Sequence, residues 1–391
     1  MRRILFIALI LTILCACSCG KQTQKEEDNE IQTDGETTGW SIVSITTIKE
    51  HGKSIDWLPE GNLIATARPL YDRYYDVVTF SMDDPDTETW LTHKATGAPQ
   101  KHNGNPAWHP SGEYLVFTAE NEDVPDIYDD VAKPGRGINC NLWLARADGS
   151  GFWQLTDIDT AVVNAGGVIH PQFSPNGDRL FWAERVSDDN DTYWGHWTIK
   201  VADFVDNGSE PHLENVNIYD PAIQPGFYES HAFSHDGQRV VFTGNLLEGQ
   251  HETGMDLYVM NLQTEGLTRL TTTFTDWDEH AHWSPDGEYI VWMSSTDLGV
   301  EWPKDMGPLD WRFYLATELW IMDAEGSNKE RLTFYNDPDH SHNKAARTVV
   351  SDSAWSPDGD SLIMLVAHYD GTGPSSTATA ELVLVTIQKE Q

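Results

Sequence analysis

The chain has 391 residues, with 25 Lys plus Arg against 62 Asp plus Glu, and a formal net charge of −37. Binding to nucleic acid needs a basic face, so this composition excludes nucleic acid as a partner. It also disfavours direct contact with anionic lipid headgroups, and its simplest meaning is solubility or a saline habitat.

Residues 1–16 have the pattern of a lipoprotein signal peptide. Two arginines precede an apolar run, Ile4 to Leu14, that is too short to span a bilayer. The sequence Leu14-Cys15-Ala16-Cys17 resembles a bacterial lipobox, which implies that Cys17 carries the lipid. An ordinary signal peptide is the alternative. By resemblance to enterobacterial sorting, Ser18 favours the outer membrane, facing the periplasm or the cell surface.

Residues 17–39 are expected to be a disordered tether. Between positions 20 and 39 only Ile31 is strongly apolar, and such a segment cannot bury enough surface to fold. Residues 40–391 then form one large domain, and we expect the membrane to be reached only through the lipid anchor.

The rest of the chain is organised around six copies of one unit, clearest at His280 to Trp292. Each copy has an aromatic residue, a four-residue turn that ends in Gly, and a short apolar run. In Ser284-Pro285-Asp286-Gly287, Pro presets φ for the turn and Gly takes the left-handed position that starts the second strand. The repeated aromatics are Trp57, Trp108, Phe173, Phe233, Trp283 and Trp355.

A third strand and a short fourth strand ending in Leu-Thr recur downstream, for example Leu319 to Met322 and Arg331-Leu332-Thr333. Four strands need roughly 40–45 residues, so longer gaps between aromatics contain insertions. The pattern predicts an all-β fold, a six-bladed β-propeller of four-stranded antiparallel blades. The last blade lacks a Leu-Thr strand, and Ser41 to Ile48 is predicted to close the ring from the N-terminus.

The Ser-Pro-Asp-Gly turns and the Arg-Leu-Thr endings make residues 40–388 similar to the TolB-like, or PD40, β-propeller repeats. The resemblance implies the propeller fold. It says little about function, because that group includes scaffolds, binding proteins and enzymes.

Aligning the repeats on their aromatics brings histidines and carboxylates from adjacent blades to the central channel. Imidazole and carboxylate groups that converge in this way indicate a site for Zn²⁺, Mn²⁺ or Fe²⁺. The alternative is a set of polar channel residues that bind water. The candidate ligands are His170, His231, His280 and His282, with Glu229, Glu279 and Asp352 close by.

The His280-x-His282 pair is also similar to the Gln-x-x-His-x-His element that holds Mn²⁺ in oligogalacturonate lyases, where His231 would correspond to a further ligand. Trp277 stands at the Gln position, and those lyases have seven blades. An acidic chain could bind such a substrate only if the metal and a residue such as Arg185 or Arg347 offset the field.

Insertions are where binding residues are expected on a repeat scaffold. Trp302 and Trp311 are candidates for stacking on sugars or anchoring a protein, and His340 and His342 are further ligand-binding candidates. The acidic loops at 121–130 and 187–191 are either Ca²⁺ sites or solvated loops.

The sequence favours a monomeric, lipid-anchored binding protein or scaffold of the bacterial cell envelope, with a protein or glycan partner. It assigns no catalytic residue. The alternative is a metal-dependent polysaccharide lyase or hydrolase that acts at the histidine cluster.

Overall fold

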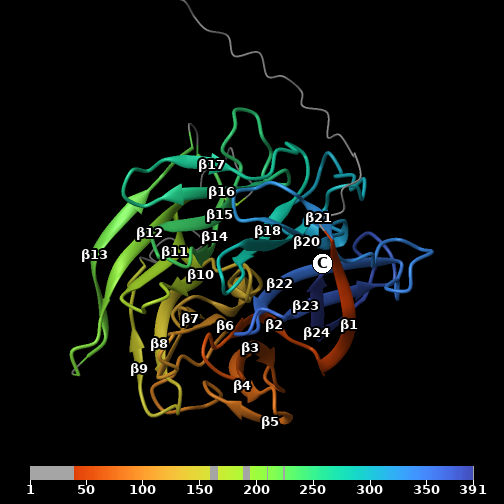
Figure 1. Cartoon of the computed structure of the whole chain (residues 1–391). Helices are drawn as coiled ribbons and strands as arrows, with labels where there is room; N and C mark the ends of the chain where they lie inside the picture. Colours follow the sequence, from red (N-terminus) through yellow and green to blue (C-terminus); the bar gives the residue numbers. More distant parts are fainter. Residues whose placement is uncertain (1–38, 159–165, 188–193, 209, 223–224, 391) are drawn as a thin grey trace, which may run out of the picture. The chain divides into compact units, whose positions relative to one another are not determined.

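This computed structural model describes residues 39–158, 166–187, 194–208, 210–222 and 225–390, and within them six four-stranded sheets surround a central axis (Figure 1). Neighbouring strands are antiparallel throughout. The predicted six-bladed β-propeller is therefore confirmed. The predicted signal peptide and lipidation at Cys17 fall outside the described residues.

The first three blades follow chain order from an inner to an outer strand. Blade 1 contains β2 (Lys53–Trp57), β3 (Leu63–Pro69), β4 (Tyr75–Ser81) and β5 (Asp84–Trp90). Blade 2 contains β6 (Asn103–Trp108), β7 (Tyr114–Glu120), β8 (Cys140–Arg146) and β9 (Phe152–Gln154). Blade 3 contains β10 (Gly167–Phe173), β11 (Arg179–Ser187), β12 (His196–Val205) and β13 (His212–Tyr219).

The last three blades repeat this arrangement. Blade 4 contains β14 (Tyr228–Phe233), β15 (Arg239–Gly244), β16 (Asp256–Asn261) and β17 (Leu267–Arg269). Blade 5 contains β18 (Asp278–Trp283), β19 (Tyr289–Ser294), β20 (Glu318–Asp323) and β21 (Glu330–Arg331). Blade 6 contains β22 (Arg347–Trp355), β23 (Ser361–Tyr369), β24 (Ala378–Lys389) and, from the other end of the chain, β1 (Trp40–Glu50).

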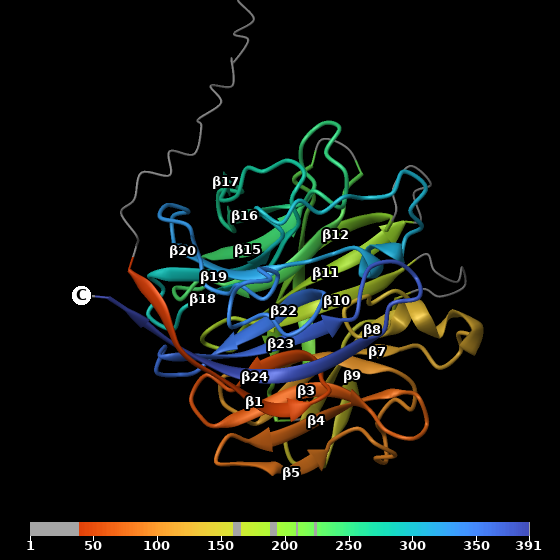
Figure 2. The same ribbon diagram turned by 90° about the vertical axis from the view of Figure 1, so that its right-hand side faces the viewer.

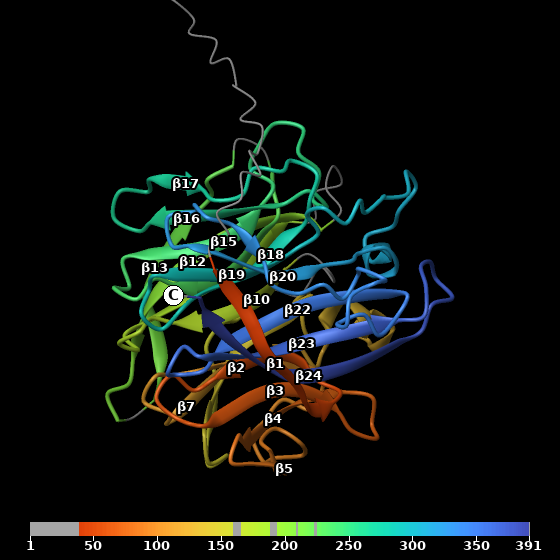
Figure 3. The same ribbon diagram turned by 45° about the vertical axis from the view of Figure 1, so that its right-hand side comes forward.

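Strand β1 closes the ring. It pairs antiparallel with β24, with Trp40 opposite Lys389 and Glu50 opposite Glu381. Figures 2 and 3 show this red strand beside the dark blue β24. The prediction that Ser41 to Ile48 supplies the missing outer strand is confirmed, and closure covers an edge of β24 that would otherwise be free to pair with another chain.

In blades 3 to 6 the repeated turn is fixed by a serine. Ser284 Oγ donates to Asp286 Oδ1 at 2.5 Å and accepts the backbone N–H of Tyr289 at 3.0 Å. Gly287 has φ 75°, which only glycine adopts without strain. The apolar runs on both sides of each turn are buried between adjacent blades, and this interblade packing holds the inner strands in place around the channel.

Two short 3₁₀ helices lie in the insertions, η1 (Asp126–Ala132) and η2 (Asp310–Phe313). Within the described part of the chain, no helix is both long and apolar enough to cross a membrane.

Candidate metal centre

A bulge in every inner strand positions the channel residues. The register of each inner strand shifts at the same step, so the side chains there leave the regular alternation and face the axis. Ser54, Asn105, His170 and His280 adopt positive φ, between 47° and 53°. This conformation is strained for residues other than glycine, and such strain is concentrated at functional sites.

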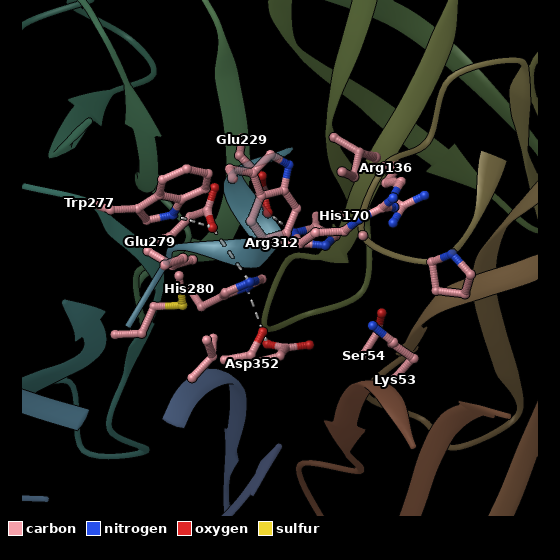
Figure 4. A pocket seen from close by; sticks show the side chains of 18 of the residues that line it. Lys53, Ser54, Arg136, His170, Glu229, Trp277, Glu279, His280, Arg312 and Asp352 are labelled. Atoms are coloured by element: carbon pink, nitrogen blue, oxygen red, sulfur yellow. Dashed lines mark hydrogen bonds and ion pairs between the residues drawn. The ribbon is translucent and has the colours of Figure 1, made fainter. Parts of the chain in front are cut away.

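Three histidines and one glutamate from three adjacent blades meet beside these bulges. One nitrogen or carboxylate oxygen from each of His170, Glu229, His231 and His280 lies within 4.8 Å of the others, and all four residues are buried. The His280 ring centroid is 5.1 Å from that of His170 and 5.7 Å from that of His231. In Figure 4, His170, Glu229 and His280 point toward a common centre.

His231 gives the strongest indication that this cluster binds a ligand. Its side chain is 1% exposed, and neither ring nitrogen has a hydrogen-bond partner. A buried polar group without a partner costs about 1–3 kcal/mol. Burial also holds the pKa of His231 well below its usual value, so the ring is neutral and has a lone pair to donate. The donor set of neutral imidazoles and a carboxylate fits Zn²⁺ or Mn²⁺.

Two buried carboxyl groups, Glu229 and Glu279, lie beside the histidines. Trp277 Nε1 donates to Glu279 Oε2 at 2.8 Å, and the two carboxyl groups influence each other's pKa. Burial raises the pKa of Glu229 to about 8, and burial together with the Glu229 charge raises that of Glu279. His170 Nδ1 lies 2.6 Å from Glu229 Oε1, so this carboxyl also orients one of the imidazoles.

The structure places the other predicted metal ligands around the cluster. His282 Nε2 lies 3.4 Å from Asp352 Oδ1, and His280 Nδ1 lies 3.6 Å from the same oxygen. Asp352 also accepts the backbone N–H of Ile55 at 2.9 Å. Asp352 is therefore held in place by blade 1 and can orient His280. His282 faces Asp352, and does not join the four-residue cluster.

A cavity of about 190 Å³ opens onto His170, Glu229 and His280. A second cavity, of about 10 Å³, is lined by His231 and also touches His170 and His280. His170 and His280 of the cluster therefore line both cavities. The aromatic side chains that line the larger pocket are Trp194, Trp197, Phe227, Trp277, Trp311 and Tyr369.

Only one of the predicted insertion ligands lines this pocket, and that is Trp311. Trp302 packs on Trp277, with ring centroids 5.8 Å apart. His340 and His342 contact each other at 4.3 Å between centroids, and their Nδ1 atoms accept backbone N–H groups at 3.1 and 3.3 Å. Ligand binding by Trp302, His340 and His342 stays a prediction.

The acidic loop at 121–130, interpreted from the sequence as either a Ca²⁺ site or a solvated loop, places its side chains against basic residues. Asp126 and Asp129 lie 3.3 and 3.1 Å from Arg73, and Asp130 lies 2.9 Å from Arg136. Three carboxylates of this loop are therefore paired with arginine side chains. The second acidic loop, 187–191, lies almost wholly outside the described residues.

Sequence reasoning missed the basic side of the pocket, which is formed by Lys53, Arg136 and Arg312. It proposed Arg185 and Arg347 for this role. Arg185 Nε instead donates to the Trp194 carbonyl at 2.7 Å, and Arg347 lies 3.7 Å over the Tyr369 ring. No sequence signal could have found the three basic residues, because they come from separate segments without a common motif.

No family model and no curated protein matches the chain. Solved structures with a similar fold include TolB from Acinetobacter baumannii, with 14% identity, a TM-score of 0.47, and coverage of 91% of this chain and 66% of that one. Oligogalacturonate lyase from Vibrio parahaemolyticus has 12% identity, a TM-score of 0.46, and coverage of 88% and 95%. A prolyl endopeptidase has 13% identity, a TM-score of 0.46, and coverage of 85% and 39%. The chain thus spans less than two thirds of the TolB and peptidase structures.

Proposed function

We propose that this protein is a metal-binding propeller of the cell envelope, which holds Zn²⁺ or Mn²⁺ through His170, Glu229, His231 and His280. The adjoining pocket binds part of a glycan or protein partner. The observation that carries the proposal is His231, a buried imidazole with both nitrogens unpaired among two more neutral imidazoles and a carboxyl group. A bound metal satisfies this group and supplies a positive charge at the base of the pocket.

Elemental analysis of the purified protein tests the metal centre. After loading with Zn²⁺ or Mn²⁺ and exhaustive dialysis, we expect about one equivalent in the wild type and none in a His231→Ala/His280→Ala variant. A His340→Ala/His342→Ala variant is the matched control, because its two histidines lie outside the pocket, and it should retain the metal. A metal-free wild type would disprove the proposal.

The lipobox-like sequence supports anchoring to the envelope. We expect the full chain to partition with membranes in a bacterial host and a Cys17→Ala variant to be recovered in the soluble fraction. Mass spectrometry of the N-terminal peptide checks whether Cys17 is acylated. Equal partitioning of both forms would remove the anchor from the proposal.

A second candidate function, a metal-dependent polysaccharide lyase or hydrolase, is favoured by Glu279, a buried carboxyl group that lines the pocket beside the proposed ligand Glu229 and whose pKa is raised by burial. A carboxyl group whose pKa is raised by burial can act as a general acid toward a leaving oxygen in the pocket. The metal, when bound, would polarise an oxygen of the substrate. The chain's own contribution is the proton on Glu279 and the aromatic wall that orients the substrate.

This candidate is tested by incubating the metal-loaded protein with neutral and acidic polysaccharides and measuring reducing ends and unsaturated products. A Glu279→Gln variant should retain metal and lose turnover. If the wild type forms no product, the enzymatic candidate is withdrawn and the binding function stands.

A further inference from the structure

Three cations line one side of the pocket in a chain that has few of them. Lys53, Arg136 and Arg312 face the cavity, although the whole chain has only 25 Lys plus Arg against 62 Asp plus Glu. Figure 4 shows Lys53 and Arg136 across the pocket from Trp277. Their convergence makes this side of the pocket positive, as an anionic ligand would need, while Glu229, Glu279 and Asp352 line other parts of the same pocket.

The cations are incompletely neutralised. Arg136 and Arg312 both contact the Asp130 carboxylate, at 2.9 and 3.3 Å, and Lys133 contacts it at 2.8 Å. One carboxylate is thus shared by three basic side chains. Lys53, whose side chain is solvent-accessible inside the pocket, makes no ion pair with any described residue. This part of the pocket retains a net positive charge.

The surroundings of Lys53 agree with a net positive charge in this part of the pocket. Although the Lys53 side chain reaches solvent in the pocket, desolvation by the surrounding walls, followed by the charge of Arg136, lowers its pKa to about 8. An acid group next to Lys53 would counter the repulsion between these cations. The electrostatic environment is therefore one in which binding an anion restores the charge balance.

The opposite wall determines what the rest of the ligand can be. Trp194 and Trp277 pack with their ring centroids 5.5 Å apart, and Trp311 lies 5.3 Å from Trp277. Flat aromatic faces of this kind favour a ring or another apolar group. The cavity of about 190 Å³ is small, so it accommodates a single ring and not a folded chain.

We propose that Lys53, Arg136 and Arg312 form an anion subsite, which binds the carboxylate or phosphate group of a small cyclic ligand lying against the tryptophans. The inference deepens the proposed function, since it names the chemical class that the metal-bearing pocket accepts. It depends on a different group of residues from the metal cluster, so the two can fail separately.

Titration calorimetry with three probes of one ring type tests the subsite: glucuronate, glucose 6-phosphate and glucose. We expect at least one acidic probe to bind about tenfold more tightly than glucose, a preference that weakens as NaCl is raised. Whichever acid binds better identifies the group that the subsite prefers. Equal binding of all three probes, or binding of none, overturns the inference.

A Lys53→Met variant removes the unpaired cation and keeps the length of the side chain. It should lose most of the preference for the acidic probe while its metal content stays unchanged. Lys344→Met is the matched control, because Lys344 lies away from the pocket and pairs with Glu381 at 3.1 Å. If both variants lose the preference equally, general charge and not the subsite is responsible. A metal-free protein that still prefers the acid disproves the metal centre alone.

Discussion

At the scale of single residues, His231 places a polar side chain where an apolar one would be more stable in the absence of a ligand. Replacing it with leucine removes two unpaired nitrogens from the interior. In EDTA we expect His231→Leu to raise the free energy of unfolding by about 1–2 kcal/mol. With saturating Zn²⁺ or Mn²⁺ the wild type should become the more stable of the two proteins, because only the wild type gains the free energy of metal binding. Urea unfolding with EDTA and with metal measures both free energies of unfolding. A variant that is less stable than the wild type in EDTA would contradict the prediction that His231 is destabilising without a metal.

Asp56 makes folding depend on pH. Its carboxyl group accepts the backbone N–H of Trp108 at 2.6 Å. Burial raises the pKa of Asp56 from 3.8 to about 7; among the smaller effects, His282 lowers this pKa and Asp352 raises it. Between pH 4 and 7 the unfolded chain ionises this group while the folded chain keeps the proton. Stability is therefore lost as pH rises through this window, and it stays lost above pH 7.

An Asp56→Asn variant keeps the hydrogen bond and cannot ionise. Relative to this variant, the wild type should lose up to about 1.4 kcal/mol of unfolding free energy per pH unit between pH 4 and 7. Denaturant titrations across this range measure the difference. Parallel pH curves for the two proteins would show that Asp56 ionises normally.

The repeat made part of the site predictable at this scale. Because every blade has the same geometry, alignment of the sequence on the repeated aromatics is enough to bring His170, His231 and His280 together. The same alignment could not separate His282 from the cluster, since the bulge between Glu279 and His282 breaks the alternation of the strand. Bulges depend on neighbouring backbones and leave no clear mark in the sequence.

At the scale of the structural element, the recurring Leu-Thr motif has a physical explanation. The strands end just before it, and the threonine hydroxyl then ties the end of the outer strand to the start of the third. Thr333 Oγ1 accepts the N–H of Leu319 at 2.8 Å and donates to Glu318 Oε2 at 2.6 Å. The equivalent donor–acceptor pairs are Thr92 with Asp76, Thr156 with Asn141 and Thr271 with Asp256.

A Thr333→Val variant has nearly the same shape and lacks both hydrogen bonds. Because the buried carboxylate of Glu318 loses a donor, we expect a loss of about 2–4 kcal/mol in unfolding free energy. Thr268→Val, in the exposed outer strand β17, is the control and should change stability by less than about 0.5 kcal/mol. Equal effects from both substitutions would argue against the hydroxyl as a strand connector.

The sequence predicted the elements better than it predicted the pocket. Strand type, blade number and closure by β1 follow from local patterns that repeat along the chain. The pocket combines η2, the segment around Arg136 and β2, which lie far apart in sequence and have no common pattern. Such an assembly depends on how the insertions pack over the propeller.

At the scale of the whole molecule, the net charge of −37 opposes the compact state. Raising NaCl from about 0.05 to 1 M screens this repulsion, since the Debye length falls to about 3 Å. We expect the midpoint of thermal unfolding to rise with salt, as measured by differential scanning calorimetry. An equal osmolality of sucrose serves as the control for effects that do not involve charge. A midpoint that falls with salt would show that attractive ion pairs dominate.

The closure of blade 6 also brings the two ends of the described chain together, because the backbone N–H of Glu390 donates to the carbonyl of Gly39. A short linker between these residues would complete a covalent circle without moving any blade. The gene could then be opened in a loop between two other blades, and the rearranged protein would have the same ring of sheets and the same central cluster. In this architecture the order in which the blades are encoded is separable from the function that they jointly build.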